Sequence, residues 1–303
     1  MRDTPSTDDA GPSLTRRALL GGGAAALAAT AGCAGDADVV VGKHDESEST
    51  YDLAEGSLRV DAEYGDVSVE PASDETVRVR VVESGSVFAS LADVTVDVAR
   101  EGDTVTVEST GSVDGFLASA PDVDIRVELP AGVAVESATL ANGALTVEEV
   151  AVPSGTTLRT RNGDATVRNV DADLAVQTTN GDVLAEGVAG YVTGESRNGD
   201  VQLQDCDGVD GAATTNGDVT AEVAAVRGDT NIESVNGDVT ADVSPSLDAT
   251  VVARSDNGDA SVGDLPLTLD ADSESYVEGT LDGGSHDLRC VTTNGDVHLG
   301  RLS

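Results

Sequence analysis

Apolar and polar residues alternate with a period of two along most of the chain from Ser57 to about Leu140. This alternation predicts β-strands with one buried face, because successive side chains of a strand point to opposite sides. Short segments containing glycine separate the runs and supply turns, and no helical periodicity of useful length interrupts them. The alternating segments are 58–62, 67–70, 77–81, 94–98, 105–108 and 123–129.

From residue 141 the chain repeats itself, and the tripeptide Asn-Gly-Asp marks each repeat. Its asparagines, the first in an Asn-Gly-Ala variant, are Asn142, Asn162, Asn180, Asn198, Asn216, Asn236, Asn257 and Asn294. Successive markers are 20, 18, 18, 18, 20, 21 and 37 residues apart. A near-constant period of this size predicts a solenoid, whose coils bury a core only by stacking on their neighbours. We interpret the gap of 37 residues as two coils whose middle marker is lost near Asp282-Gly283.

Alignment of the coils on the asparagine, counted as position one, separates inward from outward positions. Position four holds Leu145, Ala165, Val183, Val201, Val219, Val239, Ala260 and Val297, and position six holds Val147, Val167, Ala185, Leu203, Ala221, Ala241, Val262 and Leu299. Position five, between them, is mostly polar. The sequence therefore predicts an all-β fold: a β-solenoid of 18–21-residue coils over 141–303, continuous with a strand-rich region over 51–140.

The Asn-Gly-Asp tripeptides are interpreted as structural corners of the coils. Asn and Gly tolerate the left-handed backbone that a corner demands, and stacked Asn side chains can hydrogen-bond along a ladder. The Asp carboxylates can accept hydrogen bonds from nearby backbone N–H groups. Carboxylates repeated at about one strand spacing, ~4.8 Å, also leave weak binding of hard cations open. No cofactor is expected.

Composition narrows the core and the partners. The chain has no Trp, two Phe and four Tyr, so its core is narrow and built from small side chains. Its 56 acidic and 17 basic residues give a formal net charge of −39, and one of the basic residues is a lysine. Such a surface repels phosphate backbones, which excludes nucleic acid as an expected partner. The acidic, lysine-poor surface resembles proteins of extreme halophiles, in which salt screens the self-repulsion.

The first 32 residues carry the pattern of an export signal. Arg16-Arg17 precedes an apolar stretch that ends at Ala31, an arrangement that resembles the twin-arginine signal. The stretch is shorter than the ~20 residues needed to span a bilayer. Small residues then lead into Cys33, as in the lipobox of exported lipoproteins, although Thr30 replaces the usual Leu.

The sequence thus predicts a signal peptide over 1–32 and a lipid on Cys33 that anchors the protein at the outer face of the cytoplasmic membrane. Stable attachment needs a double chain, because one chain binds only marginally. Residues 33–50 are small, acidic and lack apolar periodicity, so we expect a flexible tether.

Catalytic chemistry has little support in the sequence. The chain has three histidines and none of the common metal, phosphate-loop or nucleophile motifs. Acidic pairs such as Glu148-Glu149 are uninformative among 56 acids, and Arg227-Gly228-Asp229 is interpreted as another corner. We predict a protein that is not an enzyme, with Cys206 as a buried small residue and with free thiols at Cys206 and Cys290.

The organisation resembles the putative adhesin family of bacterial and archaeal β-strand-repeat proteins, a domain of unknown biochemical function. The resemblance covers roughly Gly56 to Gly300, and it rests on the segments 64–69, 124–133 and 141–143 and on the Asn-Gly-Asp-Val coils. It implies a fold rather than an activity, and the family offers no catalytic residues to transfer.

Three functional hypotheses remain. The first is a non-enzymatic surface module that binds or scaffolds an unidentified surface protein or glycan. The second is a polysaccharide-active β-helix enzyme, which needs basic and acidic residues gathered in one groove. Arg159, Arg161, Arg168 and Arg197 are too few and too scattered to indicate a clamp for uronic acids. The third is an accessory protein that senses the state of the cell envelope.

Overall fold

The computed structural model describes residues 43–85, 94–111 and 122–303, and these residues form two sheets of β-strands. The all-β prediction is confirmed. In this part of the chain no helix is long and apolar enough to cross a membrane. Arg16, Arg17 and Cys33, the residues of the predicted export signal and lipid site, lie outside the described residues.

Each sheet contains one strand from almost every coil. Sheet A has 12 strands in the order β1 (Lys43–Asp52), β4 (Thr76–Gly85), β7 (Asp122–Leu129), β3 (Asp66–Pro71), β9 (Leu145–Glu148), β11 (Ala165–Arg168), β13 (Val183–Glu186), β15 (Val201–Gln204), β17 (Val219–Val223), β19 (Val239–Val243), β25 (Val297–Arg301) and β21 (Ala260–Val262). Sheet B has 13 in the order β22 (Thr268–Ser273), β23 (Tyr276–Leu281), β20 (Ala249–Asn257), β24 (His286–Asn294), β18 (Thr230–Asn236), β16 (Gly208–Asn216), β14 (Tyr191–Glu195), β12 (Leu174–Gln177), β10 (Thr156–Asn162), β8 (Val133–Asn142), β2 (Gly56–Ala62), β6 (Thr104–Gly111) and β5 (Val94–Glu101).

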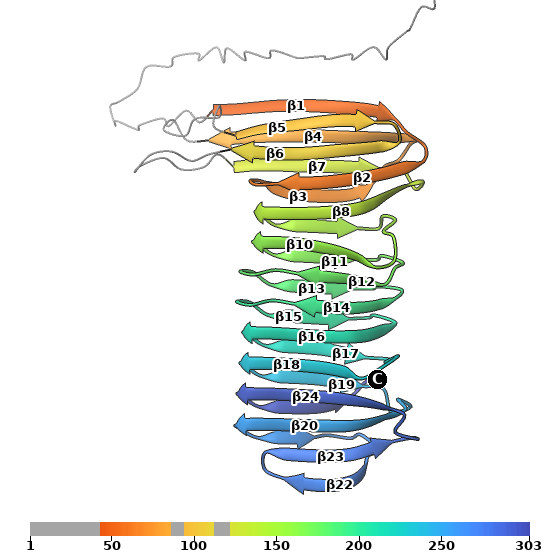
Figure 1. Cartoon of the computed structure of the whole chain (residues 1–303), viewed down its shortest axis with the longest axis vertical. Coiled ribbons are helices and arrows are strands. Elements are labelled where there is room, and N and C mark those ends of the chain that lie inside the picture. The colour runs from red at the N-terminus through yellow and green to blue at the C-terminus, as the bar shows by residue number, and fades with distance from the viewer. Residues whose placement is uncertain (1–42, 86–93, 112–121) are drawn as a thin grey trace, which may run out of the picture. The chain divides into compact units, whose positions relative to one another are not determined.

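A central coil consists of a strand of sheet B, the Asn-Gly-Asp corner, a short strand of sheet A and a second corner back to sheet B. In one example β10 runs into the corner at Asn162 and on into β11, and the chain then returns to begin β12. Equivalent strands of successive coils pair in parallel and in register, as Ala165 does with Val183. The coils therefore stack one on the next, and this confirms the predicted solenoid (Figure 1).

The core fills the narrow space between the two sheets with Val, Leu and Ala. Every residue at position four is buried, and so is every residue at position six except Val262, which is partly buried. At position five the side chains are exposed or half-buried, as the alternation predicted. The period-two pattern therefore located the buried face of sheet A correctly in all the repeats.

At the C-terminal end the stacking order departs from the sequence. Asn294 of β24 pairs with Asn236 of β18 on one side and with Asn257 of β20 on the other, so the last coil lies between two earlier ones. The prediction of a coil with a lost marker in the gap of 37 residues is wrong. That gap instead contains the hairpin β22–β23, which pairs antiparallel with β20, and Asp282-Gly283 lies in a turn after β23.

The N-terminal end is also built out of order, and it belongs to the same two sheets as the repeats. Strand β2 pairs in parallel with β8 and with the outer strand β6, while β3 pairs in the same way with β9 and β7. The predicted continuity of this region with the solenoid is confirmed. Strands β1, β4 and β5 extend the sheets by antiparallel pairing.

The predicted tether is too long. Residues 43–50, expected to be flexible, form most of β1, which pairs along its full length with β4. Its acidic composition suits an edge strand, because charges on an unpaired edge oppose association with another sheet. A strand of this kind lacks the apolar alternation by which the other strands were recognised.

Candidate functional site

The asparagines of the repeat lie in one column at the first corner of the coils. The Nδ2 group of each donates to the Oδ1 atom of the asparagine in the preceding coil of the stack, at 2.7–3.1 Å. At the end of the column, Asn142 donates to the Glu63 carbonyl. The column includes Asn142, Asn162, Asn180, Asn198, Asn216, Asn236, Asn294 and Asn257, in stacking order.

The aspartates of the corner form a second ladder. In six successive pairs the backbone N–H of one aspartate donates to the Oδ1 atom of the aspartate in the preceding coil, at 2.8–2.9 Å. One carboxylate oxygen of each accepting residue is thus used within the fold. The described residues contain no group of three or more His, Cys, Asp or Glu side chains arranged to hold a metal ion. Cation binding by this column stays a prediction.

At each corner the glycine, and not the asparagine, adopts the left-handed backbone conformation. The corner glycines have φ between +143° and +158°, whereas none of the corner asparagines has a positive φ. A Cβ atom on any of these glycines would lie 2.0–2.3 Å from a carbonyl oxygen of the preceding coil in the stack. Glycine is therefore required by the close approach of two backbones, and asparagine by its ladder.

A third ladder, which the sequence analysis missed, lies inside the corner. Buried hydroxyls two residues before the asparagine donate to the corner glycine carbonyl of the neighbouring coil, at 2.7–2.9 Å. They belong to Thr160, Thr178, Ser196, Thr214, Ser234, Thr292 and Ser255. The signal was present, because every complete Asn-Gly-Asp marker follows Ser or Thr at that spacing. These ladders make the corners structural.

The outward face of sheet B carries arginine, glutamine and threonine side chains that take no part in the three ladders. Its strands β10 to β18 and β24 line a shallow hollow of about 460 Å³ that includes Arg159, Gln177, Thr179, Arg197 and Thr215. Arg161 lies on the same strand as Arg159, two positions nearer the corner. We call the outward side chains of these six strands, at one, three and five residues before the asparagine, the arginine face.

The arginine face corrects the sequence interpretation that the repeat arginines are scattered. Arg159 and Arg161 lie on β10, and Arg197 follows β14 in the same column as Arg161. Arg168, by contrast, lies on sheet A and pairs with Glu186 at 3.0 Å. Parallel stacking brings together three arginines that are up to 38 residues apart in the chain.

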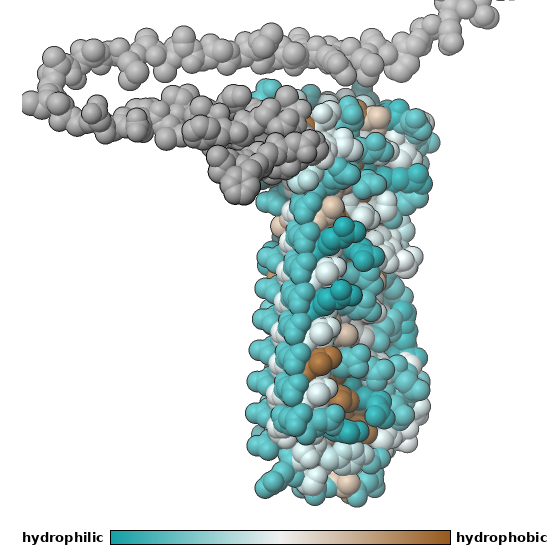
Figure 2. Space-filling model, turned by 60° about the vertical axis from the view of Figure 1, so that its left-hand side comes forward, coloured by the Kyte–Doolittle hydropathy of each residue, from teal (hydrophilic) through white to brown (hydrophobic). Residues whose placement is uncertain are grey.

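Acidic and apolar groups complete this face. Glu195 and Glu233 also line the hollow, and Gln177 donates to Glu195 at 2.9 Å. Val235 is 43% exposed. Hydrophobic residues lie together on the lower half of the surface shown in Figure 2, within surroundings that are mostly hydrophilic.

The Arg227 side chain is engaged within the fold, so the tripeptide Arg227-Gly228-Asp229 does not offer it to a partner. Its guanidinium is held by Asp210 and, at 2.6 Å, by Asp173, and it stacks over the Tyr191 ring with 4.4 Å to the centroid. These contacts raise the pKa of Arg227 and fix the side chain against the surface. Asp229 accepts the backbone N–H of Asp287, so it is engaged in the stack as well.

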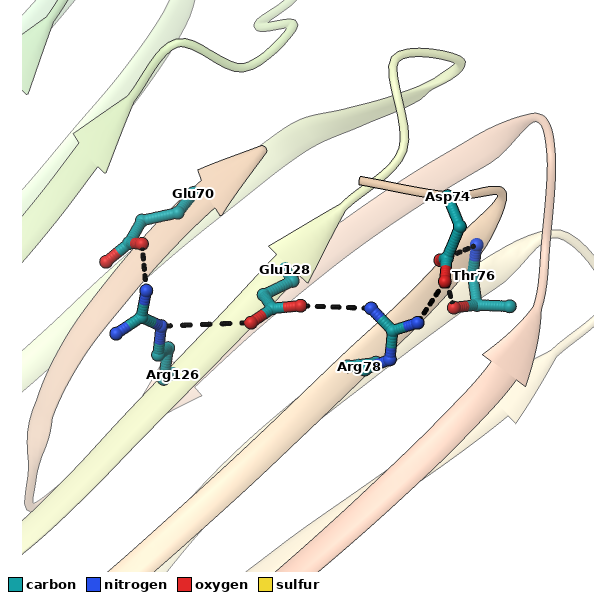
Figure 3. Close-up of polar contacts among 6 residues, drawn as sticks. All are labelled: Glu70, Asp74, Thr76, Arg78, Arg126 and Glu128. Carbon is teal, nitrogen blue, oxygen red and sulfur yellow. Dashed lines mark hydrogen bonds and ion pairs between the residues drawn. The ribbon is translucent and has the colours of Figure 1, made fainter. Parts of the chain in front are cut away.

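An ion-pair network crosses the outward face of sheet A near the N-terminal end (Figure 3). Glu128 on β7 interacts with Arg78 on β4 at 3.1 Å and with Arg126 at 4.0 Å, and Arg126 also pairs with Glu70 on β3. Arg78 contacts Asp74, whose pKa is lowered chiefly by the Thr76 hydroxyl and then by Arg78. The network joins three strands that the sheet arranges side by side.

The remaining candidates for chemistry are dispersed. Glu149 of the Glu148-Glu149 pair occupies the second corner of its coil with φ +53°. Cys206 and Cys290 are free, buried thiols, as predicted, and burial raises their pKa values to about 11 and about 12. These thiols are therefore protonated and unreactive near neutral pH.

Residues 55–300 match the family described as Toastrack DUF4097. No curated protein matches the chain. Among solved structures, a putative adhesin from Bacteroides fragilis is similar over 85% of this chain and 97% of its own, with 12% identity and a TM-score of 0.46. A putative lipid binding protein from Parabacteroides distasonis is similar over 84% of this chain and 96% of its own, with 9% identity and a TM-score of 0.31.

Proposed function

The chain belongs to the Toastrack DUF4097 family, and from this premise we propose that it is a non-enzymatic binding module anchored at the outer face of the cytoplasmic membrane. Its arginine face binds a partner on the cell surface. The observation that carries the proposal is the alignment of outward polar side chains in register along six strands of one sheet, whose arginines have no ion-pair partner among the described residues. A flat, repeated surface of this kind suits an extended ligand better than a small molecule, which needs an enclosing pocket.

The anchor in this proposal comes from the sequence. Arg16 and Arg17 direct export, and a lipid on Cys33 holds the module at the membrane. Residues 34–42 then separate the lipid from the first strand, β1. The acidic body adds no attraction to an anionic membrane surface, so attachment depends on the lipid alone.

A second candidate, a polysaccharide-cleaving enzyme, is favoured by one observation. Glu195 and Glu233 occupy the same outward column on β14 and β18, with β16 between them. Two strand spacings place their backbones about 9.6 Å apart. Inverting glycosidases hold two carboxyl groups roughly 6.5–9.5 Å apart, and the hollow beside them carries arginines.

The test is cross-linking on intact cells in their growth salt, with capture of tagged full-length protein and mass spectrometry of what it holds. Wild type is compared with Cys33→Ser and with an Arg161→Gln/Arg197→Gln variant. We expect one reproducible partner that is lost in both variants. Capture that is unchanged in the arginine variant would contradict the assignment of the face. A partner retained by released Cys33→Ser protein would contradict the need for an anchor.

A further inference from the structure

We propose that the arginine face binds an anionic polysaccharide, whose carboxylate or sulfate groups are held by Arg159, Arg161 and Arg197. This inference rests on the proposed function and names the ligand class of the same face. Four features of the face support it: its charge, the availability of its arginines, the spacing of its columns and the residue types at its outward positions.

The charge of the arginine face is opposite to that of the protein as a whole. Its outward positions carry Arg159, Arg161, Arg197 and Arg289 against two acids, Glu195 and Glu233. In the same six coils, positions five and seven on sheet A carry one arginine and three acids, namely Arg168, Glu186, Glu222 and Asp242. Within a chain of net charge −39, this face is therefore a local site for anions.

The arginines of this face are also available. Among the described residues, eight arginines form ion pairs, and these are Arg59, Arg78, Arg80, Arg100, Arg126, Arg168, Arg227 and Arg254. None of the four on the arginine face has an ion-pair partner within that part of the chain. An incoming carboxylate or sulfate therefore displaces no internal salt bridge, and a guanidinium can bind it through two parallel hydrogen bonds.

The spacing suits a polymer. Arg161 and Arg197 share one column, and Thr179 of the intervening coil lies between them, so their backbones lie about two strand spacings, ~9.6 Å, apart. The shorter side chains of Thr179 and Thr215 line the hollow together with Arg197 and flank it in this column. A chain of sugars that runs along the stack presents acidic groups at a regular interval to the arginines and hydroxyls to the threonines.

The residue types on this face favour an anionic ligand over a neutral one. None of its outward positions holds an aromatic residue. Neutral sugars are commonly held against aromatic rings, and Tyr191, the aromatic residue nearest in sequence to this face, is covered by Arg227. Recognition here thus depends on charge and hydrogen bonds, which an acidic sugar supplies.

The experiment measures binding of the full chain, as Cys33→Ser, to immobilised polygalacturonate, dextran sulfate and neutral dextran. The face variant is Arg161→Gln/Arg197→Gln. The matched control is Arg168→Gln/Arg301→Gln, which removes the same charge from sheet A. Far-UV circular dichroism verifies that all three proteins are folded in the salt used, and released reducing ends are measured in parallel.

We expect the Cys33→Ser parent, called wild type below because its arginine face is unchanged, to bind at least one polyanion and not dextran. The face variant should lose about tenfold in affinity per arginine, and the control should lose less than about twofold. The polyanion that binds better distinguishes carboxylate from sulfate recognition. No polyanion binding by wild type, or equal losses in both variants, would overturn the inference.

The outcome also separates this inference from the proposed function. A partner captured on cells through the arginine face, in the absence of polyanion binding, would leave the binding module standing and reject the ligand class. Reducing ends that appear with wild type and vanish in Glu195→Gln would instead establish cleavage and reject the non-enzymatic role.

Discussion

In the middle of the stack, from β10 to β19, each coil lies beside the coil that follows it in the sequence, whereas at both ends the order changes. Strand β24 lies between the earlier strands β18 and β20, and β2 lies between the later strands β6 and β8. The middle is thus held by contacts between neighbours in the chain. The ends depend on contacts between segments far apart in sequence, which are slower to form and need both partners present.

The ends also stop the stack. The outermost strand of a stack of parallel coils has backbone N–H and C=O groups that are free to pair with a strand of another molecule. A stack without a cap at its end would therefore associate with further molecules. Antiparallel strands close sheet B at both ends, with β22–β23 beyond β20 and β5 beyond β6, and they close sheet A at the N-terminal end, with β4 and β1 beyond β7. The other end of sheet A is the short strand β21, which pairs in parallel with β25. The outermost strands carry exposed acids, among them Asp45, Glu46, Asp270 and Asp272. Regular coils therefore provide the surface, and irregular ends provide its termination.

The largest expected difference is in stability, between two shortened proteins that each lack 18 residues from a different part of the stack. Deletion of residues 180–197 joins Thr179 to Asn198 in register and removes one whole middle coil. We expect the shortened protein to fold with a single cooperative transition, because each coil contacts only its neighbours. Truncation of residues 286–303 removes the inserted coil and leaves β20 without its parallel partner. Buried Leu288, Val297 and Leu299 are lost, at roughly 1.5–3 kcal/mol each.

Urea unfolding followed by far-UV circular dichroism checks this comparison. The truncated protein should lose the cooperative transition of its last coils, or fail to fold. If both shortened proteins unfold alike, the insertion of β24 is of no special importance. If the internal deletion fails to fold, the middle coils are not independent of their position in the stack.

The coils themselves could be predicted from sequence, and their order could not. Positions four and six identified the core because a strand repeats every two residues. The corner at Asn294, however, carries the same hydrogen-bonding groups as the corners at Asn236 and Asn257, so any of them can stack on any other. Stacking order depends on the connections, and the strands β22 and β23 carry no marker that distinguishes a cap from a coil.

The candidate site was missed for a related reason. The alignment used residues after the asparagine, which form sheet A, whereas the arginine face is formed by residues before it. Aligned on the same asparagines, Arg161 and Arg197 fall in one column two coils apart. Their lack of ion-pair partners, by contrast, depends on side-chain contacts that no spacing in the sequence reports.

A glycine at a middle corner should matter more than a glycine at an end turn. In Gly217→Ala the new Cβ would lie 2.3 Å from the Gly199 carbonyl oxygen, and φ is +145°. Gly102, in the β5–β6 turn, has φ +61° with no atom within 4 Å of an added Cβ. We expect Gly217→Ala to lower the free energy of unfolding by about 3–4 kcal/mol and Gly102→Ala by about 1 kcal/mol. Equal losses in urea titrations would show that close stacking does not determine the cost.

The two thiols can report which region opens first. In single-cysteine variants of the Cys33→Ser chain, Cys206 reports a middle coil and Cys290 the inserted strand β24. At low denaturant we expect Cys290 to react with a thiol reagent about tenfold faster, because end coils open before middle ones. Equal rates at every denaturant concentration would mean that the stack opens as one unit.

The same thiols make stability depend on pH in a defined direction. Their folded-state pKa values, about 11 for Cys206 and about 12 for Cys290, lie above the ordinary value of 9.0. Above pH 9 the unfolded chain loses thiol protons that the folded chain retains, so stability falls as the pH rises from about 9 toward 12. Cys206→Ala/Cys290→Ala should flatten that part of the profile, and an unchanged slope would assign it to other groups.

The smallest expected effect lies in the ion-pair network of the N-terminal end. Arg78→Gln removes contacts to both Asp74 and Glu128, whereas Arg254→Gln, at the other end of the stack, removes the same charge and one pair, with Asp256. We expect Arg78→Gln to lower the Tm by about 1–3 °C at low salt and Arg254→Gln by less, because isolated exposed pairs contribute little. Both shifts should shrink at 1 M salt, where the Debye length is about 3 Å. If the Arg78→Gln shift persists at that salt concentration, the side chain supports β3, β4 and β7 through packing and not through charge. The N-terminal end is then held together by side-chain packing rather than by ion pairs, as the middle coils are.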